Sequence, residues 1–225
     1  MAMPPDLELR RARLKARLVP LVEAGQFCDP VPMVQEGAVA IDGLIDESVW
    51  PLACPEFYLD PESPTPDAPC FCFLTDGDNL FMGARYDLSG LDLSKLEPDS
   101  ISLRVNLVSL LGDYSREARI RFLPLDSTGG ADGRAFVDCP HYNQTISYDY
   151  ASRVHENCWT LEFSIHMREV MGSSDRYLFY QLAFRNRLRS GGALCFYPVA
   201  EVGESPDGRK LVLAGYRNYF DLERS

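Results

Sequence analysis

The sequence predicts an all-β fold, an antiparallel β-sandwich that follows an N-terminal α-helical arm. From residue 39 onward, short runs of alternating apolar and polar residues are separated by turn-forming residues, which is typical of a sandwich. Before that point, residues 6–19 carry the apolar spacing of a helix. The 225 residues are 46% hydrophobic, enough to bury a substantial core. We therefore expect a helical arm and linker at 1–35 and one sandwich domain at 36–225.

The N-terminal helix is expected to be apolar on one side and basic on the rest. Pro20 should end or kink it. A basic helix can contact an anionic membrane or an acidic protein partner, so a protein partner for this helix stays open. The interpretation that we favour is that the helix docks through its leucines and offsets an acidic body. The apolar and basic residues concerned are Leu7, Leu14, Leu18 and Val22, and Arg10, Arg11, Arg13, Lys15 and Arg17.

The strands are expected where period-2 alternation is interrupted by turn residues. The proline-rich stretch 55–69 is expected to be a surface loop, because proline breaks strands and helices. Residues 167–172, MREVMG, resemble a single helical turn after a strand. The expected strands are 69–75, 79–87, 100–109, 117–124, 144–153, 158–166, 178–188, 193–199 and 209–214.

The segment AIDGLIDESVW, residues 40–50, contains the most specific local signal. A short apolar strand at Val39 and Ile41 is expected to enter the pair Asp42-Gly43, which favours a tight turn with positive φ. The acidic and hydroxyl side chains at 46–48 can then cap a single helical turn. That turn would place Trp50 as an apolar plug.

This segment closely resembles the opening of family 9 carbohydrate-binding modules and of the wider DOMON-like β-sandwiches. Four further segments resemble family strands in the family's order, and together they cover roughly residues 36–214. The resemblance implies a jelly-roll type of sandwich, as in carbohydrate-binding modules. The four segments are FLTDGDNLFMGARYD (73–87), EPDSISLRVNL (97–107), CWTLEFSIHM (158–167) and FYQLAFRNR (179–187).

The residues with which the family grips sugar are largely replaced. Sugar-binding members hold a glucose-like ring between exposed aromatic side chains, whereas Trp50 and Trp159 occupy the family's structural positions. Lys95 stands where a stacking tryptophan is expected, and Ser102 where an acidic ligand residue is expected. Arg121 alone coincides with a polar ligand position. The resemblance therefore implies the fold more firmly than the ligand.

Arginines concentrate on the outward-facing positions of the expected strands. If these strands are neighbours, one face collects five arginines around a single glutamate. Arginine forks suit carboxylates and phosphates, so we expect an anionic ligand there, such as a uronic acid or a phosphorylated sugar. The alternative is a solvated face whose arginines pair with the glutamate and with loop carboxylates. The residues are Arg104, Arg119, Arg121, Arg185, Arg187 and Glu162.

Charge and targeting signals restrict the class of protein. The net charge is −11, which argues against binding to nucleic acid. No apolar run has the length of a signal peptide or of a membrane span. We expect a cytoplasmic protein whose seven cysteines are mostly thiols.

Two groups of residues could bind a metal ion, and in both cases a structural role is the favoured interpretation. Cys70 and Cys72 share one face of a strand and, with Cys139 and His141, could form a tetrahedral site, but the spacing matches no zinc pattern. Buried thiols are the favoured interpretation. The acidic turn after the first long strand could bind calcium through oxygen ligands, although ordinary turn formation is favoured. The residues of that turn are Asp76, Asp78, Asn79 and, after the hairpin, Asp87.

The leading functional hypothesis is a non-catalytic binding module for a carbohydrate or a similar small polar ligand, with no cofactor. A second hypothesis is a protein-interaction or structural sandwich that has lost the sugar site. A third is a haem-binding DOMON-like domain, with Met82, Met167 and His166 as candidate ligands. Glu162 with Asp99 is the one carboxylate pair that suggests hydrolysis. No nucleophile elbow, zinc-protease motif or Walker loop is present, so we do not expect an enzyme.

Overall fold

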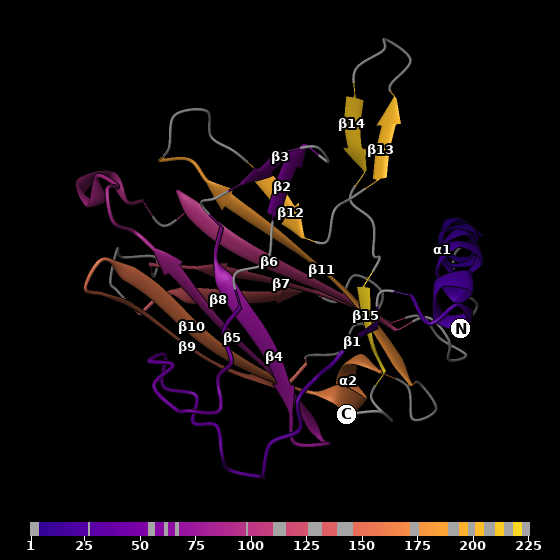
Figure 1. Cartoon of the computed structure of the whole chain (residues 1–225), viewed down its shortest axis with the longest axis horizontal. Coiled ribbons are helices and arrows are strands. Elements are labelled where there is room, and N and C mark those ends of the chain that lie inside the picture. Colours follow the sequence, from indigo (N-terminus) through magenta and orange to yellow (C-terminus); the bar gives the residue numbers. More distant parts are fainter. Residues whose placement is uncertain are drawn as a thin grey trace.

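The computed structural model is a sandwich of two β-sheets packed face to face, with the helix α1 beside it (Figure 1). It describes residues 5–26, 28–53, 57–60, 63–65, 68–97, 99–109, 116–125, 132–138, 146–171, 176–188, 194–197, 201–204, 210–213 and 218–221. The expectation of an antiparallel β-sandwich is confirmed for the two main sheets.

The larger sheet has nine strands, and its main path runs in the order β3-β2-β12-β11-β6-β7-β8. The strand β15 also pairs with β11, and β1 pairs with β15 in parallel. The other pairings of this sheet are antiparallel. The strand bounds are β1 Cys28–Asp29, β2 Phe57–Asp60, β3 Ser63–Thr65, β6 Ile101–Ser109, β7 Arg116–Leu123, β8 Arg134–Asp138, β11 Tyr177–Asn186, β12 Leu194–Tyr197 and β15 Asn218–Asp221.

The smaller sheet has four antiparallel strands in the order β4-β5-β10-β9. A separate two-stranded ribbon, β13 with β14, projects from the sandwich (Figure 1). The short helix α2, Met167–Val170, follows β10 as the sequence predicts. The remaining bounds are β4 Cys70–Thr75, β5 Asn79–Asp87, β9 Tyr148–His155, β10 Cys158–His166, β13 Glu201–Glu204, β14 Lys210–Leu213 and η1, a 3-10 turn, Leu93–Lys95.

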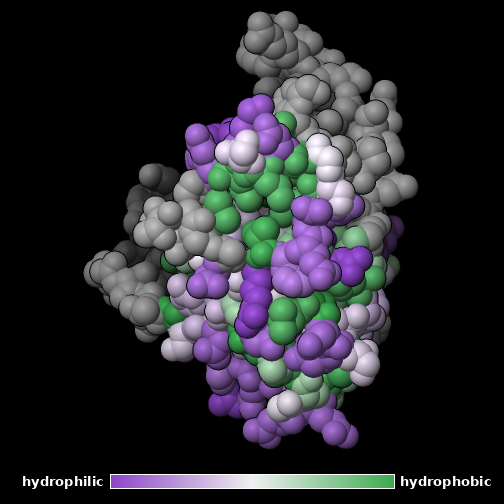
Figure 2. Space-filling view, turned by 90° about the vertical axis from the view of Figure 1, so that its left-hand side faces the viewer, coloured by the Kyte–Doolittle hydropathy of each residue, from purple (hydrophilic) through white to green (hydrophobic). Residues whose placement is uncertain are grey.

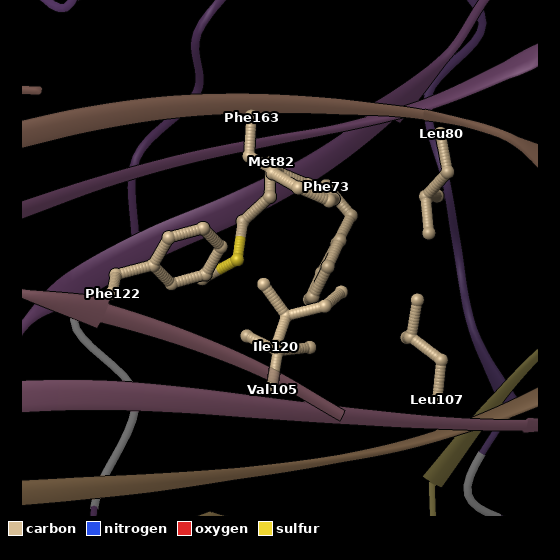
Figure 3. A pocket seen from close by; sticks show the side chains of 8 residues that line it. All are labelled: Phe73, Leu80, Met82, Val105, Leu107, Ile120, Phe122 and Phe163. Atoms are coloured by element: carbon tan, nitrogen blue, oxygen red, sulfur yellow. The ribbon is translucent and has the colours of Figure 1, made fainter. Parts of the chain in front are cut away.

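Alternating apolar side chains from both sheets fill the space between them, because every second residue of a strand points to the same side. One void in this core has a volume of about 10 Å³ and is lined by apolar side chains (Figure 3). That volume is about what one water molecule needs, and no polar partner is available there. The eight lining residues are Phe73, Leu80, Met82, Val105, Leu107, Ile120, Phe122 and Phe163.

The helix α1, Pro5–Glu23, continues through Pro20, so Pro20 does not end it, and the alternative of a kink there stays a prediction. Leu18, before the proline, is 1% exposed and packs on Val108 and Phe179 of the nine-stranded sheet. Leu21 and Val22, after the proline, pack against the same cluster. These contacts hold both sides of Pro20 on one surface, which offsets the hydrogen bond that proline removes.

Docking through Leu18 agrees with the favoured interpretation of this helix. No helix in the described part of the chain is long and apolar enough to cross a membrane. The division at residue 35 stays a prediction, although β1 and Val31, which is 3% exposed in the main core, already lie within the sandwich.

Two segments differ from the sequence expectation. The stretch 55–69 contains the hairpin β2–β3 in place of a surface loop. Its proline Pro64 lies in β3, the edge strand, where a missing N–H breaks no ladder bond. The strand β8 was not expected at all, and it forms the other edge of the main path.

The segment that resembles the family's opening lies over the outer face of the four-stranded sheet. Val39 and Ile41 form no strand, contrary to expectation. Gly43 has φ +84°, as the expected turn requires. Trp50 is 8% exposed and packs with Cys72, Leu74 and Phe81 in a cluster of its own, outside the main core. It is therefore a plug, as predicted, but on the outside of one sheet.

Candidate functional site

The candidate site lies on the outer face of the nine-stranded sheet. Directly opposite residues on neighbouring strands share a face, so the strand register orders this face into rows that cross the strands. One row contains Arg185 opposite Ser102, and Leu194 beside Arg185. The next row runs Ala183, Arg104, Arg121, Phe136. Arg134 lies on β8, two residues before Phe136, and therefore points to the same side.

We name Arg104, Arg121, Arg134 and Arg185 the arginine cluster. Among the described residues, no carboxylate lies within ion-pair distance of any of the four. Partial burial lowers the pKa of the Arg104 guanidinium, and the charges of Arg121 and Arg185 lower it further. All the charges that shift this group are thus positive. Within the described part of the chain, the cluster is a cationic site without a neutralising carboxylate, on a protein of net charge −11.

Phe136 anchors the β8 side of the cluster. The guanidinium carbon of Arg121 lies 4.8 Å from the centre of its ring, and that of Arg134 lies 4.6 Å from it. Cation–π contact of this kind holds the planar guanidinium groups in place without neutralising their charge. The two arginines are therefore oriented while their donors stay available to a ligand.

Small and amide side chains lie beneath the arginines. Ser102 and Ala183 are 4% and 8% exposed, and Gln181 is 3% exposed. The Nε2 of Gln181 and the Nε of Arg185 are buried donors without a hydrogen-bond partner. An unmatched buried donor costs about 1–3 kcal/mol, so an acceptor oxygen brought to this face relieves a cost that the free protein bears.

Two of the predicted arginines are neutralised and border the cluster. The Nε of Arg119 lies 2.9 Å from Oε1 of Glu117, a residue that is 7% exposed, and Asp138 is opposite Arg119 in register. On the other border, Nη1 of Arg187 lies 2.9 Å from Oδ2 of Asp99. Arg119 and Arg187 therefore agree with the alternative interpretation, in which arginines of this face pair with carboxylates of the chain itself.

Glu162 is not part of this face, and its assignment to the arginine site is wrong. It lies on β10 in the four-stranded sheet, on that sheet's outer side and therefore across the whole sandwich. Its Oε2 accepts the backbone N–H groups of Asp42 at 2.9 Å and of Gly43 at 2.7 Å. The alternation pattern places a residue on one side of its own strand, but it does not say which sheet holds the strand.

The surroundings of Glu162 suit a structural anchor. It is fully buried, and burial raises the pKa of its carboxyl, while the N–H donors of Gly43 and Asp42 oppose that change. Thr160 Oγ1 donates to the carbonyl of Gly43 at 2.5 Å, and Arg153 Nε donates to the carbonyl of Asp42 at 3.0 Å. Glu162 and Asp99, the carboxylate pair considered for hydrolysis and not favoured, do not share a face, because Asp99 pairs with Arg187 of the other sheet.

Sequence reasoning missed Arg134 and Phe136. Their strand, RAFVD, follows a glycine-rich stretch and has only five residues. In the structure Ala135 and Val137 pack against the main core while Arg134 and Phe136 face outward, but this alternation is too short to stand out in the sequence.

The cysteine site is not formed as a thiolate cluster. Cys70 is disulfide-bonded, so the expectation of a thiol is wrong there. Cys72 is a free thiol, 9% exposed, and burial raises its pKa to about 12. Cys139 and His141 lie outside the described residues. In the described part of the chain, no three His, Cys, Asp or Glu side chains converge as a metal site would require.

The acidic turn uses its oxygens to form the turn itself. Asp76 Oδ1 accepts the N–H groups of Asp78 and Asn79 at 2.9 and 2.7 Å. Asp87 Oδ1 accepts the N–H of Ser89 at 2.8 Å. These contacts agree with the turn-forming interpretation that the sequence analysis favoured.

The candidate haem ligands do not come together. Met82 is 1% exposed and lines the core void of about 10 Å³, which is far too small for a porphyrin. His166 Nδ1 accepts the N–H of Arg168 and so caps α2. Met167 is 9% exposed and contacts the Thr75 hydroxyl. The three residues have structural roles.

Apolar side chains flank the arginine cluster. Phe136 lies at one end and Leu194, which is 41% exposed, lies opposite Arg185 at the other. Figure 2 views the side on which η1 lies and shows apolar surface interspersed among hydrophilic residues. The surface thus offers fixed positive charges between apolar edges, which suits a small ligand that has both anionic and apolar parts.

Two packed sheets define a β-sandwich fold, and the arginine cluster lies on one of its outer faces. The sequence matches no family model and no curated protein. Among solved structures, a candidate carbohydrate-binding protein from Bacteroides uniformis is 11% identical, with a TM-score of 0.50 over 86% of this chain and 97% of that one. This likeness concerns the fold, and it confirms the resemblance seen in the sequence at that level.

Family 9 carbohydrate-binding modules from Caldicellulosiruptor kristjanssonii are similar as well. The structure in complex with cellotriose is 13% identical, with a TM-score of 0.48 over 86% of this chain and 93% of that one. The structure in complex with glucose is 15% identical, with a TM-score of 0.46 over 75% and 83%.

Proposed function

We propose that this protein is a non-catalytic binding module whose arginine cluster holds the anionic group of an acidic sugar. The observation that carries the proposal is that Arg104, Arg121, Arg134 and Arg185 face outward together without a carboxylate among the described residues. An unmatched set of guanidinium groups is matched best by a ligand that brings its own negative charge.

The chemistry of the face favours a sugar acid over a bare anion. A guanidinium fork binds a carboxylate or phosphate through two parallel hydrogen bonds. Phe136 and Leu194 supply apolar edges for the C–H faces of a pyranose ring. Ser102 and Gln181 supply polar groups at the floor for ring hydroxyls.

The proposal excludes catalysis for a chemical reason. Glycoside hydrolysis needs two carboxyl groups at a defined separation on one face. The described residues of the cluster are arginines, which stay protonated and do not exchange protons near neutral pH. The carboxylates that border the cluster, Glu117 and Asp99, are held by Arg119 and Arg187.

Isothermal titration calorimetry with glucuronate, glucose 6-phosphate and glucose tests the proposal. We expect heat with the two acidic sugars and about tenfold weaker binding for Arg121→Ala, because it removes a charge-assisted hydrogen-bond pair. Arg168→Ala is the control, since Arg168 lies on α2 at the other end of the sandwich (Figure 1). No heat with either acidic sugar, or equal affinity for glucose, contradicts the proposal.

A further inference from the structure

We infer that the site takes an oligomeric uronic acid, a chain of linked acidic sugars that crosses the strands from β11 to β8. This inference rests on the proposed function and makes it more specific, because it concerns the length of the ligand and its direction. It is carried by the arrangement of the arginine cluster and of the neutralised pairs that border it.

The arginines are distributed over four neighbouring strands. Arg185 is on β11, Arg104 on β6, Arg121 on β7 and Arg134 on β8, one on each strand in spatial order. Neighbouring strands are about 4.8 Å apart, so the positive band extends over about 14 Å across the sheet. That is longer than one sugar ring and corresponds to roughly three linked rings, given the same spacing.

Along the strand direction, the positive band is bordered on both sides by arginines that pair with carboxylates. Toward α1, Arg119 is neutralised by Glu117. Beyond that pair, Leu18 of α1 covers Val108 and Phe179. Toward the ends of the strands at η1, Arg187 is neutralised by Asp99. Among the described residues of this face, a linear polyanion therefore meets a row of unpaired cations when it runs across the strands.

The spacing of charge favours an oligouronide over a nucleic acid. The four surplus cations are spread over the length of about three rings, which suits a ligand with one carboxylate on each ring better than a ligand of denser charge. Asp138 at the border and a net charge of −11 repel a dense phosphate backbone. Phe136 and Leu194 at the two ends of the band offer apolar surface to the terminal rings.

The test is calorimetry of the full chain with galacturonic acid and its linked dimer, trimer and tetramer. We expect affinity to rise about threefold with each added residue up to the trimer and then to level off, since each ring adds one partly exposed ion pair. Arg134→Ala and Arg185→Ala, at the two ends of the band, should each weaken trimer binding about threefold. Arg168→Ala, outside the cluster, should leave the binding of both monomer and trimer unchanged.

The outcomes separate the two proposals. If the monomer binds as tightly as the trimer, the oligomeric inference fails while the proposed function stands. If no uronic acid of any length binds, the proposed function fails with it. If a neutral trimer binds with equal affinity, the inference is wrong because the carboxylates of the ligand do not matter. If a short single-stranded RNA binds more tightly than the uronic acid trimer, the inference is wrong about the class of ligand.

Discussion

The two outer faces of the sandwich are covered in opposite ways. The outer face of the four-stranded sheet is closed by the chain itself, because the segment that contains Trp50 lies over it and Glu162 binds its backbone. Among the described residues, the outer face of the nine-stranded sheet is covered at one end, where Leu18 of α1 packs. Between the paired Arg119 and Arg187, the described part of that face carries the arginine cluster, which has no carboxylate partner there.

The closed face therefore contributes to the stability of the fold, whereas the open face is suited to binding a ligand. On the closed face, polar groups of the strand find partners in the covering segment, as Thr160 and Arg153 do with the carbonyls of Gly43 and Asp42. On the open face, like charges stand together, which the fold does not need and which costs stability. Such an arrangement is typical of a surface whose partner is another molecule.

The largest effect is expected from filling the space that Gly83 leaves for Trp50. A Cβ at Gly83 would lie 2.7 Å from the indole ring, so Gly83→Ala must displace the tryptophan or bend β5. Overpacking of this kind costs about 3 kcal/mol, which lowers Tm by about 6–12 °C. Thermal unfolding followed by tryptophan fluorescence measures it.

The control for this prediction is the double variant Gly83→Ala with Trp50→Leu. The smaller leucine relieves the clash, so the two changes should cost less together than the sum of their separate costs. Simple additivity would show that the covering segment does not press on β5 through Trp50.

A smaller effect is expected at Glu162. Glu162→Ala leaves the N–H groups of Asp42 and Gly43 without their acceptor, which costs about 2 kcal/mol. Glu162→Gln keeps an acceptor oxygen and should retain most of the stability. Denaturant unfolding at pH 7 compares the two variants, and equal losses in both would show that the acceptor is not what matters.

The same residue sets a pH dependence with a definite sign. Burial raises the pKa of folded Glu162 above its ordinary value of 4.5, so the folded protein holds this proton more tightly than the unfolded chain does. Its contribution to stability is complete below pH 4.5 and is lost as the pH rises through the folded pKa. Glu162→Gln should remove this decline, seen as a flatter plot of Tm against pH. An unchanged slope would contradict the assignment.

The sequence predicted much of the fold because alternation is a local property. The bounds of β5 and β10 agree with expectation, as do the inward sides of β6, β7 and β11, since each strand has enough residues to show period 2. The hairpin β2–β3 was not predicted because prolines in that stretch indicate a loop, although an edge strand tolerates them.

The site was predicted less completely because it depends on which strands are neighbours. Arg104 and Arg121 are opposite each other, as supposed, because β6 and β7 follow one another in the chain. Glu162 was misplaced because nothing local assigns β10 to the other sheet. Arg134 was missed because five residues are too few for alternation to stand out from the preceding turn. Its contact with Phe136, which Arg121 also contacts, joins it to the cluster in the folded sheet.

The smallest predicted effect compares an unpaired arginine with a paired one. Arg104→Gln removes repulsion from Arg121 and Arg185, so it should leave stability unchanged or raise it by less than about 0.5 kcal/mol at low salt. Arg187→Gln breaks a half-exposed ion pair with Asp99 and should lower stability by a similar amount. Both differences should fade as salt is raised to about 0.5 M, because the Debye length shortens. Chemical denaturation at two salt concentrations measures them. If Arg104→Gln loses stability as Arg187→Gln does, then Arg104 has a partner within the chain, and the open face is as self-contained as the closed one. Opposite signs, with sugar-acid binding weakened mainly by Arg104→Gln, would establish that the charge which destabilises the free protein is the charge that the ligand uses.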